Sequence, residues 1–272
     1  MRTSLLAIGV VVAISVGATA IAAGPAETDP GLAAAIKAPT RTPANVARDP
    51  YRHPAATLAF FGVKPGQTVV EVWPAGGWYT EILAPYLKGK GTLYAADIWP
   101  NQLRGIRAKQ AADAATYGDI KLAAFPTFAA SDPKIPDNSV DVVVTFRNVH
   151  NWRMGYQRNG QDYSVEAFKQ IFAMLKKGGT LGVEDHRLPE SAPDDQERSS
   201  GYVKVSTVRR LAEAAGFQYV GSSEINANPK DTKDYPKGVW TLPPSLQLGA
   251  VDRDKYLAIG ESDRMTLKFR KP

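Results

Sequence analysis

The fold is decided by the stretch Val69-Val70-Glu71-Val72-Trp73-Pro74-Ala75-Gly76-Gly77-Trp78-Tyr79-Thr80-Glu81-Ile82-Leu83, in which a short apolar strand runs through a glycine turn into a helix. Doubly wound sheets present backbone N–H groups to a nucleotide or nucleoside in this way, because glycine permits a tight turn and a close approach of the ligand. A second apolar run, at 92–96, ends in Asp97. A carboxylate at the end of the second strand is placed to accept hydrogen bonds from a ribose diol. Together these features predict a ligand with an adenosine-like ribose.

Strands and helices are predicted to alternate through the rest of the chain. We expect strands at 68–72, 92–96, 120–125, 140–146, 180–184, 217–222 and 264–270, and helices at 55–61, 79–87, 102–117, 165–175 and 206–215. The run at 140–146 is nearly all β-branched, as in a parallel strand buried on both faces. Residues 264–270 alternate as a half-exposed antiparallel strand does. The fold class is therefore α/β, with a three-layer, doubly wound, mostly parallel seven-stranded sheet and one antiparallel strand.

The ends of the chain and its composition limit the classes of function. Arg2 precedes an apolar run at 5–23 with Ala-x-Ala sites, which predicts a Sec-type signal peptide at 1–23 and a periplasmic protein; an uncleaved membrane anchor is the alternative. No membrane association is expected after cleavage. The chain has no cysteine, which excludes disulfides and thiolate chemistry. Its net charge of +6 is spread along the chain instead of being concentrated in a basic run, so nucleic-acid binding is not indicated.

The predicted domains follow from the same reading. Residues 24–43 are rich in proline, alanine and threonine and are interpreted as a flexible N-terminal arm, with one short helix possible at 31–37. Residues 44–272 form a single domain. Between its last two strands lies a polar insert at 226–256, and an insert of this length is either functional or disordered.

Glu71, Trp73, Ala75 and Gly77 stand at the positions of the motif E-x-G-x-G-x-G, with two of its glycines replaced. The chain thereby resembles the class I S-adenosylmethionine-dependent methyltransferases, and within them a group of predicted exported methyltransferases whose motif reads like WPGGGW. The resemblance implies a Rossmann-like methyltransferase fold and S-adenosyl-L-methionine as cofactor. It assigns cofactor binding to the following residues: Glu71, Pro74, Ala75, Gly76, Gly77, Trp78 and Asp97. The other interpretation of the turn is an ordinary strand-to-helix connection in which Trp73 plugs the former pocket.

The resemblance also implies that the segment after the fourth strand, 146–152, faces the methyl acceptor. His150 is the candidate general base, because an imidazole titrates near neutral pH, and Arg147 and Asn148 are further catalytic candidates. Candidates for substrate binding are Tyr51, His53, Asn151, Trp152 and His186. Each has a plainer alternative: His150 as a cap of the next loop, and residues 48–54 as a surface turn instead of a lid. The cluster at 184–187 lacks tight metal-ligand spacing, so it is interpreted as a charged pocket wall and no metal site is predicted.

The predicted function is therefore methyl transfer from S-adenosylmethionine to a small molecule. The alternative is a non-catalytic periplasmic ligand-binding protein that retains the fold. A nicotinamide-dependent oxidoreductase is disfavoured, since the chain lacks G-x-G-x-x-G. The sequence predicts neither the acceptor nor the oligomeric state.

Overall fold

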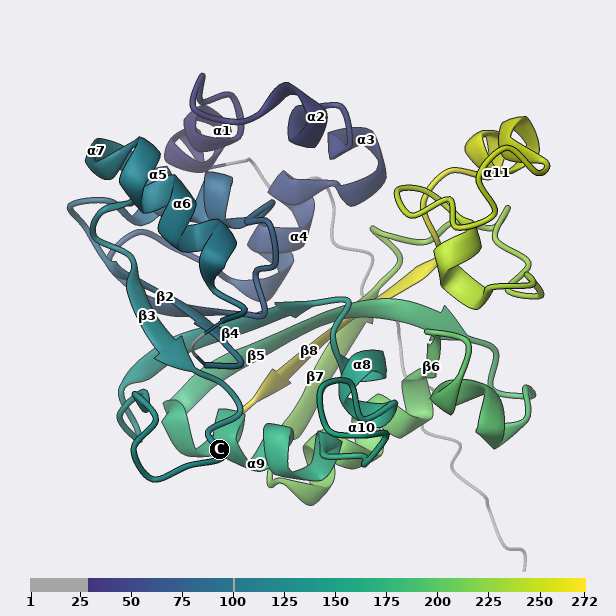
Figure 1. Ribbon diagram of the computed structural model, residues 1–272. Helices are drawn as coiled ribbons and strands as arrows, with labels where there is room; N and C mark the ends of the chain where they lie inside the picture. Colours follow the sequence, from purple (N-terminus) through teal and green to yellow (C-terminus); the bar gives the residue numbers. More distant parts are fainter. Residues whose placement is uncertain (1–28, 100) are drawn as a thin grey trace, which may run out of the picture.

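The computed structural model describes residues 29–99 and 101–272, so the predicted signal peptide at 1–23 lies outside the described residues. An eight-stranded sheet runs through the centre in the order β3-β2-β1-β4-β5-β8-β7, with β6 paired to β5 (Figure 1). Strand β8 runs antiparallel to β5 and β7, and the other strand pairs of the described residues are parallel. The strands span β1 Thr68–Val72, β2 Thr92–Asp97, β3 Lys121–Ala124, β4 Val140–Phe146, β5 Leu175–Leu188, β6 Val203–Lys204, β7 Gln218–Ser223 and β8 Arg264–Arg270. The predicted fold class is confirmed.

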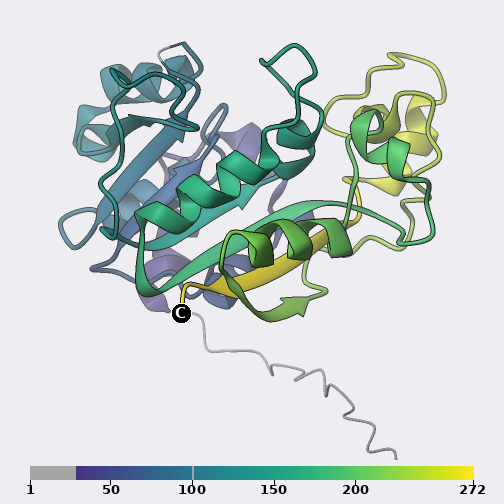
Figure 2. The ribbon, with the colours of Figure 1, turned by 90° about the horizontal axis from the view of Figure 1, so that it is seen from below.

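Helices cover both faces of the sheet, as Figures 1 and 2 show from two directions. One layer holds α1 (Pro30–Ile36), α4 (Pro54–Phe61), α5 (Thr80–Leu87), α6 (Arg104–Ala112) and α7 (Ala114–Tyr117), with the short α2 (Pro43–Val46) and α3 (Asp49–Arg52) beside them. The other layer holds α8 (Val149–Arg153), α9 (Ser164–Met174) and α10 (Val205–Ala214). Because side chains alternate along a strand, Val142 packs on the first layer and Val143 on the second.

The segment that precedes the predicted domain is packed onto it. The short helix that the sequence allows at 31–37 within the predicted arm is present as α1, and Leu32 and Ala35 are buried against the layer that contains α5. The buried Arg41 pairs with Asp49 at 2.7 Å. In the structure the first helical layer therefore begins at Pro30.

Strand β8 is buried, and the expectation that it is half-exposed is wrong. It lies between β5 and β7, so its backbone is paired on both sides, and α4 packs against it. Its alternating polar side chains find partners inside the protein: Arg264 lies 3.0 Å from Glu184, and Thr266 accepts a hydrogen bond from Asn226 at 3.0 Å. The alternating polar side chains do lie on one face of β8, but this face packs against buried polar and charged groups instead of solvent.

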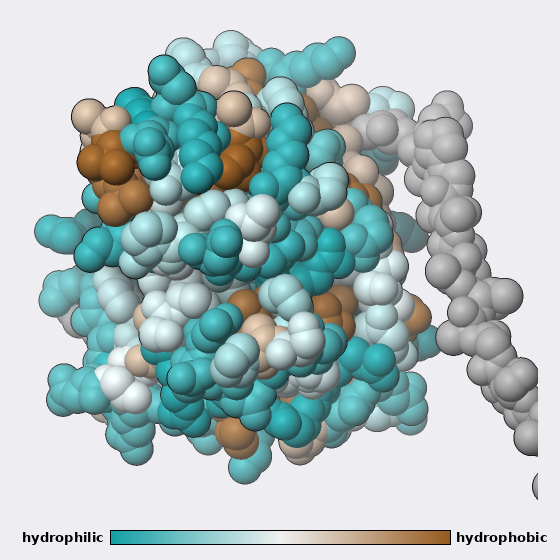
Figure 3. Space-filling view, turned by 90° about the vertical axis from the view of Figure 1, so that its right-hand side faces the viewer, coloured by the Kyte–Doolittle hydropathy of each residue, from teal (hydrophilic) through white to brown (hydrophobic). Residues whose placement is uncertain are grey.

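The insert at 226–256 is folded against the carboxyl end of β5 (Figure 1). It contains the 3₁₀ helix η2 (Gly238–Thr241) and the start of α11 (Arg253–Ile259), while a second 3₁₀ helix, η1 (Asp194–Arg198), follows β5. Figure 3 views the molecule from this side, where the surface is mostly hydrophilic and hydrophobic residues form small separate patches. Across residues 29–99 and 101–272, none of the helices has the length and apolar character needed to cross a bilayer.

Candidate functional site

A cavity of about 270 Å³ opens at the carboxyl ends of β1, β4 and β5. Ligands of open α/β sheets bind at this edge. The cavity brings together nine of the residues predicted from sequence: Glu71, Pro74, Ala75, Trp78, Arg147, Asn148, His150, Asn151 and His186. Five further wall residues come from the insert: Val239, Trp240, Pro243, Pro244 and Ser245. The insert is therefore part of the site, a role that its composition did not indicate.

The glycine turn has left-handed backbone at the three positions where the motif E-x-G-x-G-x-G places glycine, although two of these residues are not glycine. Trp73, Ala75 and Gly77 have φ angles of 53°, 51° and 83°, all in the left-handed region. That region favours glycine and costs other residues about 1–2 kcal/mol each. A Cβ at Gly77 would lie 2.8 Å from Lys109 Cε, whereas a Cβ at Gly76 would meet nothing within 4 Å. The left-handed φ of Gly77 therefore favours glycine, and Gly76 is an exposed turn residue. Neither of these two predicted cofactor-binding residues lines the cavity.

The indole of Trp73 spans the end of strand β2. Its Nε1 donates a hydrogen bond of 2.9 Å to the carbonyl oxygen of Phe125, which follows β3. Since β2 lies between β1 and β3 in the sheet, the side chain passes over the carboxyl end of β2. The rings of Trp152, Tyr156 and Tyr163 pack around it at centroid distances of 6.1, 6.0 and 6.4 Å. Trp73 therefore fills space beside the predicted ribose site, and Trp152 lies beneath it instead of in the cavity wall.

Two buried carboxyl groups lie below the turn. Burial raises the pKa of Asp97 to about 7, although the N–H of Ile98 donates a hydrogen bond of 2.7 Å that lowers this pKa. Asp97 does not line the cavity. Burial likewise raises the pKa of Glu71 to about 7, although the hydroxyl of Thr80 donates to it at 2.5 Å. Both groups hold a proton more readily than an exposed carboxyl group does.

Asp185 holds His150 in place at the end of β4. The Nδ1 of His150 lies 2.7 Å from Asp185 Oδ1, and the backbone N–H of His150 donates to Oδ2 at 3.1 Å. The contact favours the tautomer with its proton on Nδ1, which leaves Nε2 free to accept a proton. The backbone N–H of His186 donates to Asp185 Oδ1 at 2.7 Å, so both oxygens of this buried carboxylate are engaged.

His186 faces the same cavity from β5. Its Nδ1 lies 2.5 Å from the hydroxyl of Ser262, and its ring centroid is 5.0 Å from that of His150. Burial, with His150 and then Arg147 adding to it, holds the pKa of His186 well below its usual range, so the ring is neutral. One ligand atom each of His150, Asp185 and His186 lies within 4.8 Å of the others, a spacing that a metal ion can use. Because the Asp185 oxygens already accept three hydrogen bonds, the orientation of His150 explains this cluster without a metal ion.

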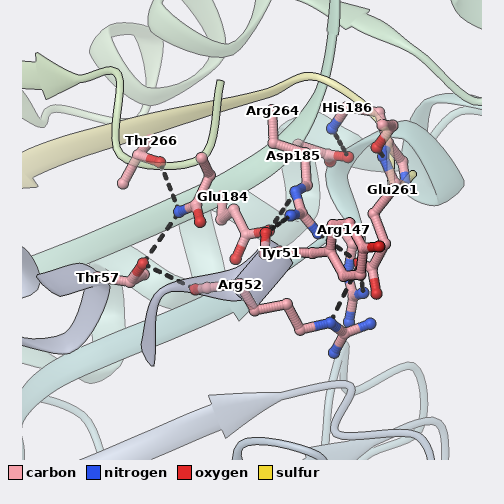
Figure 4. Close-up of polar contacts among 12 residues, drawn as sticks. Tyr51, Arg52, Thr57, Arg147, Glu184, Asp185, His186, Glu261, Arg264 and Thr266 are labelled. Carbon is pink, nitrogen blue, oxygen red and sulfur yellow. Dashed lines mark hydrogen bonds and ion pairs between the residues drawn. The ribbon is translucent and has the colours of Figure 1, made fainter. Parts of the chain in front are cut away.

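Arginines converge on Glu261 at the far wall of the cavity (Figure 4). Arg48, Arg52 and Arg264 lie 2.6, 3.2 and 2.8 Å from its oxygens. Burial alone would raise the pKa of Glu261, but the surrounding arginines outweigh it and bring the pKa to about 2. Glu261 and Ser262 were not predicted from sequence, because only the return of β8 beside β5 brings them to the site.

Tyr51 and His53 lie in a neighbouring cavity of about 200 Å³ that shares Glu261 and Ser262 with the first. The carbonyl oxygen of Tyr51 accepts a hydrogen bond from Arg264, and His53 Nδ1 lies 3.3 Å from Asn226 Oδ1. The N-terminal segment therefore forms the back of the arginine cluster and does not close the main cavity.

Comparison with known proteins agrees with this geometry. Residues 71–183, from β1 into β5, match a family model described as a methyltransferase domain. No curated protein matches the chain. An S-adenosylmethionine-dependent methyltransferase from Aquifex aeolicus is similar in structure, with 16% identity over 83% of this chain and 93% of its own, and a TM-score of 0.55.

Two further solved structures show how widely the fold is used. Phosphoethanolamine N-methyltransferase 2 of Haemonchus contortus, in complex with S-adenosyl-L-methionine, is 15% identical over 82% of this chain and 53% of its own, with a TM-score of 0.53. The [4+2]-cyclase SpnF is 16% identical over 81% of this chain and 80% of its own, with a TM-score of 0.54. The chain thus has the fold of S-adenosylmethionine-dependent methyltransferases, and its reaction has to be argued from its site.

Proposed function

We propose that the protein is a class I methyltransferase that uses S-adenosyl-L-methionine to methylate a small molecule. The observation that carries the proposal is the glycine turn, which keeps left-handed backbone at Trp73, Ala75 and Gly77 directly beside the cavity. Retaining this strained path without its glycines costs free energy, which is typical of a functional segment. The methyltransferase-domain match over the same segment supports the proposal.

The wall residues suit the charged methionine end of the cofactor. Glu71 offers a carboxylate to the ammonium group, while the turn from Pro74 to Trp78 offers backbone to the carboxylate. The adenosine end fits beside Asp97 only when the Trp73 indole leaves the end of β2, since the indole fills that space. When bound, the cofactor would supply an activated methyl group, and little beyond positioning is then required of the protein.

The residues at the end of β4 would handle the acceptor. His150, with Nδ1 held by Asp185, is placed to accept a proton at Nε2 from an acceptor hydroxyl or amine. Asn148 has a positioning role, because its amide donates to the carbonyl of Val72 at 3.0 Å and to Thr145 at 3.1 Å. It thereby ties the end of β4 to the glycine turn.

The Trp73 indole also favours a second candidate function. A protein whose adenosine space is permanently filled would bind a smaller ligand in the 270 Å³ cavity and catalyse nothing. Such a non-catalytic binding protein would keep the turn and the cavity but would have no affinity for S-adenosyl compounds.

Calorimetry separates the two candidates. Titrating the protein without residues 1–23 with S-adenosylmethionine and S-adenosylhomocysteine should give binding that Asp97→Ala weakens, because the ribose diol loses its acceptor. Absence of binding by either compound would reject the methyltransferase assignment.

We also propose that the protein acts in the periplasm. The apolar run at 5–23 and its Ala-x-Ala sites support export. N-terminal sequencing of the protein recovered from a periplasmic fraction should begin after one of these sites. Recovery of the uncleaved chain from the membrane fraction would instead favour an anchor.

A further inference from the structure

Arg147 has a backbone conformation that is unusual for an arginine. Its φ is 63°, and the turn is held by a hydrogen bond of 2.7 Å from its N–H to the carbonyl of Glu184. This region is unfavourable for residues other than glycine. The conformation turns the chain where β4 ends and places Arg147 in the wall of the cavity. Strain that places a charged side chain in a cavity suggests a functional role for that side chain.

The guanidinium of Arg147 lacks a close partner. Its nearest carboxylate oxygen, on Glu261, is 3.8 Å away, whereas Arg48, Arg52 and Arg264 lie closer to the same carboxylate. Among residues 29–99 and 101–272, no side chain or carbonyl accepts a hydrogen bond from the Arg147 guanidinium, and 21% of its side chain is exposed. It thus has donors available for a group in the cavity.

Positive charge exceeds negative charge around this side chain. Four guanidinium groups share the carboxylates of Glu184 and Glu261, and Arg52 Nη1 is buried without a hydrogen-bond partner. Burial lowers the pKa of Arg147; the two glutamates oppose this effect, and Arg264 adds to it. Desolvated positive charge of this kind is stabilised by an anion.

Aromatic side chains form one side of the cavity wall. Tyr79 and Phe146 stack at a centroid distance of 3.5 Å with 10° between their planes, and Trp78 and Trp240 complete this side. A volume of about 270 Å³ restricts the space to a small ligand. An occupant therefore has an anionic group at one end and an apolar body at the other.

We propose that the methyl acceptor is a small organic anion whose carboxylate or phosphate group binds the Arg147 guanidinium, with its apolar body against Tyr79, Phe146 and Trp240. Arginine presents a planar set of donors that matches either oxyanion. The role of this anion as methyl acceptor rests on the proposed methyltransferase function, whereas the anion site itself does not.

Binding of aromatic probes without cofactor tests the anion site. Benzoate and phenyl phosphate should bind the wild-type protein at least about tenfold more tightly than neutral benzamide, because a charge-assisted pair contributes about 1.5–3 kcal/mol. The tighter of the two anions identifies the oxyanion preferred. Equal affinity for benzoate, phenyl phosphate and benzamide would overturn the proposal.

Two variants separate binding from folding. Arg147→Gly suits a φ of 63°, so it should fold with an unchanged or higher melting temperature and lose the preference for anions. Arg209→Gln removes a half-exposed arginine of α10 and should bind the probes as the wild type does. A folded Arg147→Gly variant that keeps wild-type benzoate affinity would refute the role of Arg147.

Competition assigns the anion site to the acceptor or to the cofactor. Benzoate should bind equally well in the presence of saturating S-adenosylhomocysteine. Displacement of benzoate by this compound, but not by adenosine, would overturn the assignment, because the carboxylate of the cofactor would then occupy Arg147. Failure of S-adenosylhomocysteine to bind at all would refute the proposed methyltransferase and leave the anion site intact.

Discussion

Replacing Trp73 by glycine tests whether the indole competes with the cofactor. Glycine is the residue that the motif E-x-G-x-G-x-G places here, and it suits the φ of 53°. In the wild-type protein, adenosine can lie beside Asp97 only if the indole gives up its hydrogen bond to Phe125 and its packing on the neighbouring rings. We therefore expect S-adenosylhomocysteine to bind Trp73→Gly more tightly than the wild type.

The contacts of Trp73 set the expected size of this effect. Breaking one hydrogen bond costs about 1 kcal/mol, and each of the three lost aromatic contacts costs about 0.5–1.5 kcal/mol, so opening the site costs roughly 2.5–5.5 kcal/mol. At about 1.4 kcal/mol per factor of ten, the affinity should rise by at least about 60-fold. Truncating a buried tryptophan costs about 3–5 kcal/mol, and relief of the left-handed strain returns about 1–2 kcal/mol. The variant should therefore be less stable by about 1–4 kcal/mol.

Calorimetry with S-adenosylhomocysteine on the wild type, Trp73→Gly and Trp73→Phe gives the affinities, and thermal unfolding gives the stabilities. Phenylalanine keeps a ring but cannot donate to the Phe125 carbonyl, so its affinity should lie between the other two. Equal affinities of wild type and Trp73→Gly would refute the idea that the indole occupies cofactor space. A folded Trp73→Gly variant that binds no S-adenosyl compound would instead support the non-catalytic alternative.

Three further predictions concern stability. Gly77→Ala should lower the free energy of unfolding in urea by about 1–2 kcal/mol, since φ is 83° there, whereas Gly76→Ala, in open space, should change it by less than about 0.5 kcal/mol. Burial raises the pKa of Asp97 to about 7 in the folded state, so the folded protein keeps this proton at pH values where the unfolded chain has lost it. The free energy of unfolding should therefore fall by up to about 4 kcal/mol between about pH 4 and pH 8. The variant Asp97→Asn should flatten this dependence, and a variant with the pH profile of the wild type would contradict the prediction. Glu261→Gln should cost about 3–5 kcal/mol by leaving buried arginines uncompensated, whereas Glu224→Gln, at a carboxylate that is 68% exposed, should cost less than about 1 kcal/mol by thermal unfolding.

Elements with a strong local pattern were predictable from sequence. The strands expected at 68–72, 140–146 and 264–270 have these bounds in the structure, because β-branched runs and clean alternation are local signals. The expected helix at 102–117 is instead divided into α6 and α7, since Asp113 caps the second helix by accepting a hydrogen bond from the Thr116 N–H. Strand β5 continues to Leu188, beyond the predicted end at 184, because β8 and β6 pair with its extension. Such pairings join residues far apart in the chain and leave no local signal.

The site residues that could be predicted from sequence are those at the carboxyl ends of the strands and in the glycine turn. Glu71 lies near the end of the predicted strand at 68–72, and Arg147 and His150 come shortly after the predicted strand at 140–146. The cavity brings the three residues together. Glu261 and Trp240 reach the cavity through the insert and the return of β8, which no periodicity indicates. The position of the Trp73 indole depends on one hydrogen bond to the end of β3, so it too required the folded sheet.

Backbone strain connects the two ends of the cavity. Trp73, Ala75 and Arg147 are all non-glycine residues in left-handed conformations, and all three line the same cavity. At about 1–2 kcal/mol each, their strain is comparable to a large part of the net stability of a domain, so packing around β1 and β4 has to maintain it. Glycine at these positions would have avoided that cost while keeping the path of the chain. The gain from a residue other than glycine therefore lies in its side chain: Trp73 places an indole over the predicted adenosine space, and Arg147 places a guanidinium over the predicted acceptor space. The variants Trp73→Gly and Arg147→Gly remove each side chain with little change to the backbone, and their separate effects on S-adenosylhomocysteine and benzoate binding decide which half of the cavity each one controls.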